Sequence, residues 1–220
     1  MVTITVAGTA HRLVPPERGT VHLRATREAR RSSDVVPFVA DLHAQLSADA
    51  ERYVTAGAAT RWSADQVYVS TVQRYRRDSD VAETFQVAAA GVAVRFADFA
   101  ALSTWVTDAG AVDGVVVDGV DWELTDDHRC EIEREVRAEA VRDAQERAAT
   151  YAAALGLDVS SVDALYEPGL RPHEQPGWEG RGPFKITQMG AADHGGGPSV
   201  SLRPEPIEVS ATISADFTAS

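Results

Sequence analysis

Histidines, a cysteine and carboxylates are the side chains of this sequence with the chemistry to bind a metal ion. The six histidines show no HxH, HExxH or Cys/His spacing, the spacing that zinc sites use. His173 and His194 share one Gly/Pro-rich segment and could converge on a metal, but no carboxylate motif accompanies them. The sequence therefore predicts no metal site, and a metalloprotein that uses these two histidines is the weakest alternative.

The acidic run from Asp118 to Asp127 has the residue types of a calcium site without its spacing. Strand alternation would scatter its carboxylates over both faces of a sheet, so helix capping and solvation explain it better. The segment Gly195-Gly196-Gly197-Pro198 has no Lys-Ser/Thr pair and no helix after it, so it does not predict a phosphate loop. A GxSxG elbow is also missing. We therefore expect no catalytic residues, no cofactor and no enzymatic activity.

Aromatic side chains offer a different kind of chemistry, the binding of a small ligand or a protein surface. Trp178 and Phe184 lie in the Gly/Pro-rich segment, and Trp62 and Trp122 lie outside it. We interpret these four residues as a candidate ligand pocket or interface between that segment and the predicted sheet.

Composition narrows the classes of partner. A formal net charge of -12 argues against binding to nucleic acid or to an anionic membrane surface. No apolar run approaches the roughly 18 residues of a membrane span. The chain begins MVTITVAG, without the basic and apolar regions of a signal peptide, which predicts a cytoplasmic protein unless a signal has been removed. The single cysteine, Cys130, allows no intrachain disulfide.

The longest predicted element is a helix over about 126–155. Thr125 or Asp126 can cap its start, Gly156 suits its end, and no Pro or Gly lies between them. Alanines dominate the middle of its apolar stripe, which predicts close packing on a sheet, while Glu and Arg alternate on the solvated face. The stripe consists of Ile132, Val136, Ala140, Ala144, Ala148, Tyr151 or Ala152, and Leu155.

Alternating apolar residues predict the remaining elements. Two further helices are expected, one from Ser33 or Asp34 to about Val54 and a short one from Asp98. A bulge is expected at Asp118-Gly119. Strands are expected at 2–7, 20–27, 66–76, 84–96, 115–124, 159–167 and 207–217. The order β-β-α-β-β-α-β-α-β-loop-β with hairpin links predicts an α+β fold, with antiparallel sheets and three helices.

Residues 167–203 interrupt this pattern. From Glu167 to Pro198, thirteen of thirty-two residues are Gly or Pro. Neither a helix nor a strand runs through such a composition. We therefore expect a long loop inside a single domain of residues 1–220.

Several segments, in this order, resemble the SIMPL-domain family. The opening strand with Gly8 and the proline-led second strand after Pro16 are similar to the start of that family. The alanine-striped helix ending at Leu155-Gly156 and the closing strand from Pro206 are similar to its end. The sequence departs from the family at Pro204-Glu205-Pro206, where a Pro-Gly turn is typical, and in lacking the export signal of many bacterial members.

The resemblance implies an α+β fold and brings no catalytic residues. It also implies oligomers, because several bacterial members are thought to assemble, and the animal namesake associates with a signalling kinase. We therefore expect a non-enzymatic interaction or structural protein that forms a homo-oligomer through strand edges and the long loop. The alternative is a small-ligand binding module with its aromatic pocket under residues 167–203.

Overall fold

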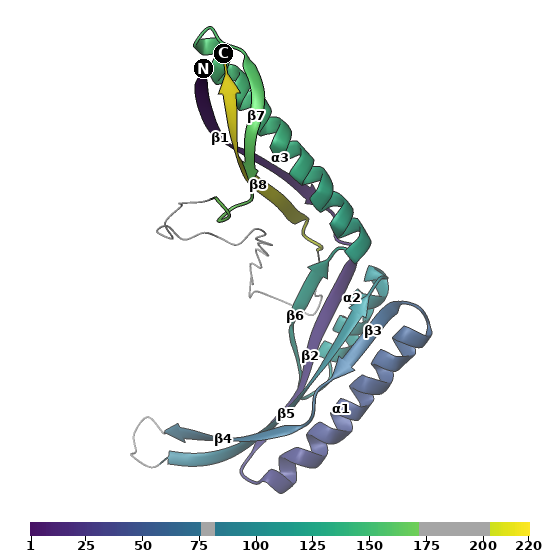
Figure 1. The fold of residues 1–220 in the computed structure, drawn as a ribbon. Coiled ribbons are helices and arrows are strands. Elements are labelled where there is room, and N and C mark those ends of the chain that lie inside the picture. The colour runs from purple at the N-terminus through teal and green to yellow at the C-terminus, as the bar shows by residue number, and fades with distance from the viewer. Residues whose placement is uncertain (76–81, 172–202) are drawn as a thin grey trace. The chain divides into compact units, whose positions relative to one another are not determined.

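The computed structural model describes residues 1–75, 82–171 and 203–220 (Figure 1). The chain forms two compact units, and the sequence prediction had placed both within one domain. Of the described residues, unit 1 comprises 1–15, 124–171 and 205–220, and unit 2 comprises 16–75, 82–123 and 203–204. The described residues form three helices and eight strands in antiparallel sheets, which confirms the predicted α+β class and element order.

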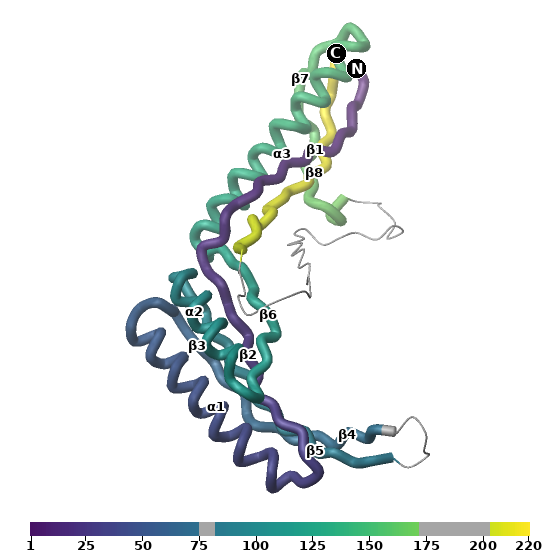
Figure 2. Tube along the Cα trace, turned by 180° about the vertical axis from the view of Figure 1, so that it is seen from behind, coloured from purple at the N-terminus to yellow at the C-terminus, as the bar shows by residue number. Residues whose placement is uncertain are grey.

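Unit 1 is a three-stranded sheet with one long helix. Its strands β1 (Val2–Val14), β8 (Ile207–Ala219) and β7 (Val159–Tyr166) lie in the order β1-β8-β7, so the two ends of the chain pair with each other (Figure 2). Helix α3 (Asp126–Ala154) packs on β1 and β8. The alanine stripe therefore lies under strands from both ends of the chain, as predicted.

Glycine at position 8 lets α3 lie directly on β1. A Cβ atom at Gly8 would come within 2.0 Å of the Ala140 carbonyl oxygen and 2.8 Å of the Ala144 backbone nitrogen. Ala140, Ala144, Ala148 and Ala152 are fully buried. The first strand was predicted to end at residue 7, but β1 continues through Gly8 to Val14. Close helix packing, not chain reversal, is the reason for a glycine here.

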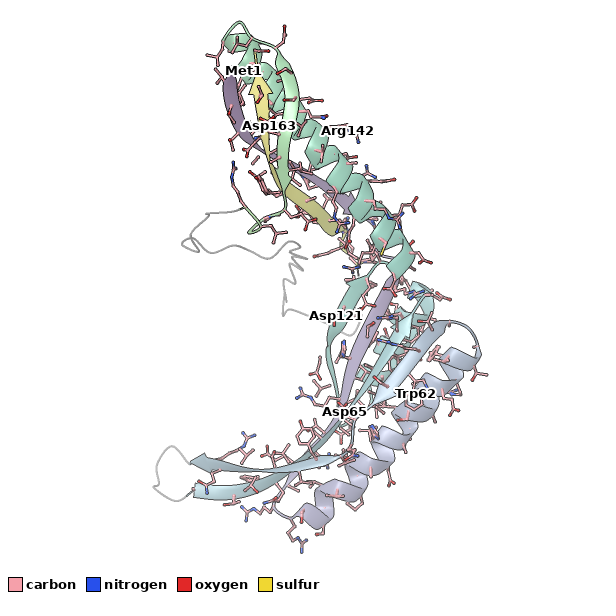
Figure 3. All side chains as sticks on the ribbon, viewed as in Figure 1. Met1, Trp62, Asp65, Asp121, Arg142 and Asp163 are labelled. Carbon is pink, nitrogen blue, oxygen red and sulfur yellow. The ribbon has the colours of Figure 1, made fainter. Side chains whose placement is uncertain are left out.

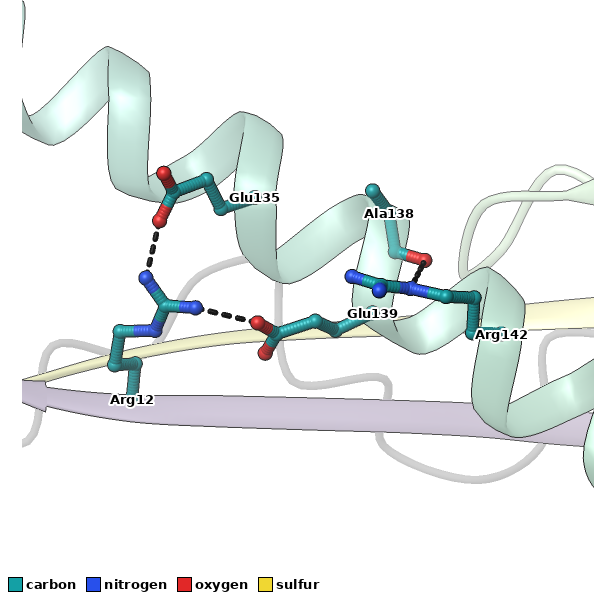
Figure 4. A network of polar contacts seen from close by, with 5 residues as sticks. All are labelled: Arg12, Glu135, Ala138, Glu139 and Arg142. Carbon is teal, nitrogen blue, oxygen red and sulfur yellow. Dashed lines mark hydrogen bonds and ion pairs between the residues drawn. The ribbon is translucent and has the colours of Figure 1, made fainter.

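Polar contacts attach the edge of β1 to α3. Arg12 donates hydrogen bonds to Glu135 and Glu139, one helical turn apart (Figure 4). The Thr9 backbone N–H donates to Asp143 at 2.8 Å, and this bond is the main reason that the pKa of Asp143 lies below its usual value. Acidic side chains of α3 therefore accept hydrogen bonds from groups at the edge of β1 that would otherwise face solvent.

Unit 2 is a second antiparallel sheet with helices on one face. Its strands are β2 (Arg18–Ala29), β3 (Ala59–Ala64), β4 (Tyr68–Tyr75), β5 (Ala82–Phe96) and β6 (Val115–Glu123). They lie in the order β3-β5-β2-β6, and β4 also pairs with β5. Strand β3 is an addition to the predicted elements. The bulge predicted at Asp118-Gly119 is confirmed by a register shift against β2.

Large side chains fill the core of unit 2. Helix α1 (Ser32–Thr55) contributes Leu42 and Leu46, and helix α2 (Phe99–Gly110) contributes Trp105. The Trp105 ring packs 5.6 Å from the ring of Phe96. Asp98 caps α2, as predicted, by accepting hydrogen bonds from the amides of Ala100 and Ala101. The opposite face of the sheet carries mostly polar side chains.

Candidate functional site

The two described aromatic residues of the predicted pocket belong to the core of unit 2. Trp62 lies on β3 opposite Val94 (Figure 3). Trp122 lies on β6 with its ring 5.1 Å from that of Phe99. Both tryptophans are partly buried against the hydrophobic core. Trp178 and Phe184 lie outside the described residues, so a pocket of all four residues stays a prediction.

No cluster of three or more His, Cys, Asp or Glu side chains suited to a metal occurs within residues 1–75, 82–171 and 203–220. His173 and His194 lie outside these ranges. Cys130 is an exposed free thiol. No helix in the described part of the chain is long and apolar enough to cross a membrane.

The candidate interaction surface is a ribbon whose outer part is two-stranded, which we call the arm. It is formed by β4 together with residues 82–89 of β5. Pairing between β2 and β5 ends at Ala29 and Gln86, so β5 beyond that point pairs only with β4 among the described strands. Figure 1 shows this ribbon extending from the sheet of unit 2.

Apolar side chains are exposed along β4. Tyr68 is 54% exposed, Val69 is 43% exposed and Val72 is 37% exposed. Because neighbouring residues of a strand point to opposite faces, Val69 lies on one face of the arm, and Tyr68 and Val72 lie on the other. The arm therefore offers both faces and the outer backbone edge of β4 for contact with another molecule.

Two ion pairs attach the outer part of the described arm to the end of β2 and the residue that follows it. Arg74 Nη2 lies 2.7 Å from Glu28 Oε2, and Arg30 Nη2 lies 3.0 Å from Glu83 Oε2. All four side chains are partly exposed, so these pairs orient the ribbon more than they stabilise it. The sequence predicted both strands of this hairpin. The only sequence signal for the arm is that the predicted strand 84–96 is longer than the predicted strand 20–27 with which it pairs.

The polar face of the unit 2 sheet carries three acid–base pairs between β2, β5 and β6. His22 Nε2 lies 3.0 Å from Asp121, Arg24 Nη2 lies 2.6 Å from Asp118, and Arg95 Nη2 lies 2.8 Å from Glu123. The His22 side chain is partly exposed. The acidic run from Asp118 to Asp127 thus supplies partners to cationic side chains on neighbouring strands.

In unit 1, a polar cluster joins β1, β8 and the residues after β7. Asp216 accepts hydrogen bonds from Thr5 Oγ1 at 2.7 Å and from Arg171 Nη2 at 2.5 Å. Arg171 also donates to Ser214 Oγ at 2.9 Å and lies over the Tyr166 ring. The bond from Thr5, followed by the contact with Arg171, lowers the pKa of Asp216. This cluster ties strands together and contains no nucleophile beside a base.

Comparison with known proteins gives a family and no named activity. Among curated proteins, none is significantly similar in sequence to this chain. The family model described as SIMPL, a protein of unknown function (DUF541), matches residues 4–217. That match reaches into both units and includes all or most of every described strand and helix. The chain therefore belongs to the SIMPL family.

Proposed function

We propose that this SIMPL protein is a non-enzymatic interaction protein that assembles with further copies of itself through the arm. The observation that supports the proposal is the unpaired outer edge of β4. Isolated two-stranded hairpins are at best marginally stable in water, so the arm gains stability from an added strand. A strand edge with free N–H and C=O groups is a template for such an addition.

The contrast with β1 supports this assignment. Strand β1 is also an edge strand, but Asp143 accepts the Thr9 amide and Arg12 binds two glutamates of α3. No helix packs on β4 to comparable extent among the described elements. Strand β4 also contains no Pro and no Lys, two residues with which proteins commonly prevent edge pairing. The edge of β1 is thus bonded to side chains of α3, and the outer edge of β4 is open.

Strand β4 is also suited to pairing with itself. In an antiparallel two-fold pair centred on Thr71, Tyr68 of one copy lies opposite Arg74 of the other. Arginine over a tyrosine ring is a favourable cation–π pair. In the same register Val69 lies opposite Gln73. Strand β4 contains no acidic residue, so the pairing brings no two carboxylates together. Such an arrangement is isologous, as most two-fold protein interfaces are.

Light scattering coupled to size exclusion tests the proposal. We expect wild-type protein at micromolar concentration to have a mass that is a multiple of the 23.6 kDa chain. Val72→Glu places a charge on the arm and should shift the protein to monomer. Val36→Glu is the matched control, because Val36 has the same 37% exposure on α1.

Two outcomes would contradict the proposal. One is a wild-type monomer whose mass does not change with dilution or salt. The other is an oligomer in which Val72→Glu has no more effect than Val36→Glu, since the interface would then lie elsewhere. Hydrogen exchange of the β4 amides in both variants shows whether the arm itself stays formed.

A further inference from the structure

The polar face of the unit 2 sheet is hollowed into a continuous groove, which we call the trough. One hollow of about 170 Å³ is lined by residues that include Arg24, Asp65, Tyr68 and Asp118. A second of about 220 Å³ is lined by residues that include Arg61, Arg95, Asp121 and Glu123. Both hollows share His22, Ser63 and Ala93 and therefore adjoin.

Small residues of β5 form the floor of the trough. Ala93 lies opposite His22, and Gly91 lies opposite Arg24. The Asp65 carboxylate rests on Gly91, since a Cβ atom there would come within 2.6 Å of Asp65 Oδ2. The Asp65 amide donates to the Gly91 carbonyl at 2.9 Å. The floor is thus regular sheet, and a strand holds the walls more rigidly than a loop would.

The trough holds donors and acceptors without partners. The Nε atoms of Arg24 and Arg95 are buried and make no hydrogen bond within the described structure. Among the described residues, the Asp65 carboxylate and the Arg61 guanidinium have no ion pair. Buried polar atoms normally have hydrogen-bond partners, so the two Nε atoms are available to a ligand or to water. Arg61 and Asp65 are exposed residues at the same face and are open to the same ligand.

Charge balance decides which ligand suits these walls. Three arginines face four carboxylates, and two of the arginines are already ion-paired with carboxylates. An anion would be repelled by the four carboxylates, and a cation would be repelled by the three arginines. A neutral hydroxyl group both donates and accepts, so it can bridge an arginine N–H and a carboxylate oxygen. The exposed ring of Tyr68 adds an apolar surface at one end.

We propose that the trough binds a neutral carbohydrate, a short oligosaccharide lying along β5. Its hydroxyls bond to Arg24, Arg95 and Asp65, and one sugar ring stacks on Tyr68. From Arg95 to the Ala89 position beside Tyr68 the strand spans about 20 Å, which exceeds the length of a single sugar ring. Tyr68 belongs to β4 and so also lies on the strand proposed for assembly, whereas the other residues that line the trough lie outside β4.

NMR titration of the labelled full-length protein with a panel of neutral trisaccharides tests this site. The panel comprises maltotriose, cellotriose, N,N′,N″-triacetylchitotriose and mannotriose, with inorganic phosphate and zwitterionic triglycine as charged probes. We expect at least one trisaccharide to shift the amides of Ala93, Gly91 and His22 saturably. Ala93→Leu fills the floor and should weaken that binding at least about tenfold. Ala40→Leu adds the same atoms at an exposed site on α1 and should leave it unchanged.

Three results would overturn the proposal. The first is that no trisaccharide of the panel gives saturable shifts in the trough. The second is that Ala93→Leu and Ala40→Leu bind equally well. The third is tighter binding of phosphate or triglycine at the same amides, which would assign the trough to a charged ligand. Preserved amide spectra elsewhere in Ala93→Leu show that the variant is folded. Loss of assembly in Val72→Glu leaves this titration interpretable, because that residue does not line the trough.

Discussion

The two units solve the same packing problem, a helix on a sheet, with side chains of different size. In unit 1 the contact is made by alanines of α3 and by Gly8, and backbone lies against backbone. In unit 2 the contact is made by leucines, Phe96 and Trp105, and side chains separate the helices from the sheet. The first interface is sensitive to added volume and the second to lost volume.

The largest expected effect is the loss of volume in unit 2. Trp105→Ala removes a side chain that is 2% exposed and leaves a cavity beside Phe96 and Tyr53. We expect a loss of about 3–5 kcal/mol in the free energy of unfolding, measured by hydrogen exchange at the β2 and β5 amides. Tyr151→Ala removes an aromatic ring that is 58% exposed, and its effect should stay within about 0.5 kcal/mol. Similar losses in both variants would show that the unit 2 core does not depend on this ring.

Adding one methyl group to a glycine in each unit compares the two interfaces directly. In Gly8→Ala the new Cβ meets backbone atoms of α3, which cannot move without moving the helix. In Gly19→Ala it meets Leu102 Cδ1 at 2.7 Å and the Trp122 ring at 2.8 Å, and side chains can rotate away. We expect a loss near 3 kcal/mol for Gly8→Ala and nearer 1 kcal/mol for Gly19→Ala, from the usual range of about 1–3 kcal/mol for overpacking. Hydrogen exchange resolved by unit measures both, and the reverse order would remove the distinction between the two interfaces.

Overpacking the middle of the alanine stripe should have a similar but smaller effect. Ala144→Leu adds three carbons at a fully buried position of α3, and we expect a loss of about 1–3 kcal/mol at the β1 and β8 amides. Ala149→Leu makes the same change at an exposed position of the same helix and should have little effect. Equal stability of both variants would mean that the helix rotates or shifts to accept the larger side chain.

Sequence reasoning succeeded where periodicity carries the information. The alanine stripe of α3, the Asp98 cap and the bulge at Asp118-Gly119 all follow from local rules and are confirmed. It failed at contacts between segments distant in sequence. The first strand was predicted to end before Gly8, because nothing near Gly8 in sequence indicates that Ala140 packs against it. The glutamates of α3 were predicted to lie on its solvated face, but one of them, Glu139, binds Arg12, 127 residues away.

The candidate sites were predictable to a smaller degree. The hairpin of β4 and β5 was predicted, but its open edge depends on where β2 stops pairing, which no local pattern encodes. The trough requires Gly91 and Ala93 to lie between His22 and Ser63, so it depends on the register of three strands. Trp62 and Trp122 were singled out for their size, and the structure places them against the core.

The smallest expected effect is electrostatic and confined to unit 1. The pKa of Asp216 is lowered by the Thr5 hydroxyl and by Arg171, so folding favours its charged form. Its contribution to stability is therefore present above the usual pKa of 3.8 and is lost as pH falls through the lower folded value. Asp216→Asn should be less stable than wild type at pH 6, by less than the packing variants, and the difference should vanish in strong acid.

NMR intensities of the β8 amides report the unfolding of unit 1, and those of the β2 amides report the unfolding of unit 2. Only unit 1 should respond to Asp216→Asn. Glu205→Gln removes an exposed charge near the start of β8 as a control, and an equal acid response in both variants would show that the Thr5–Asp216–Arg171 cluster adds nothing to the closely packed unit.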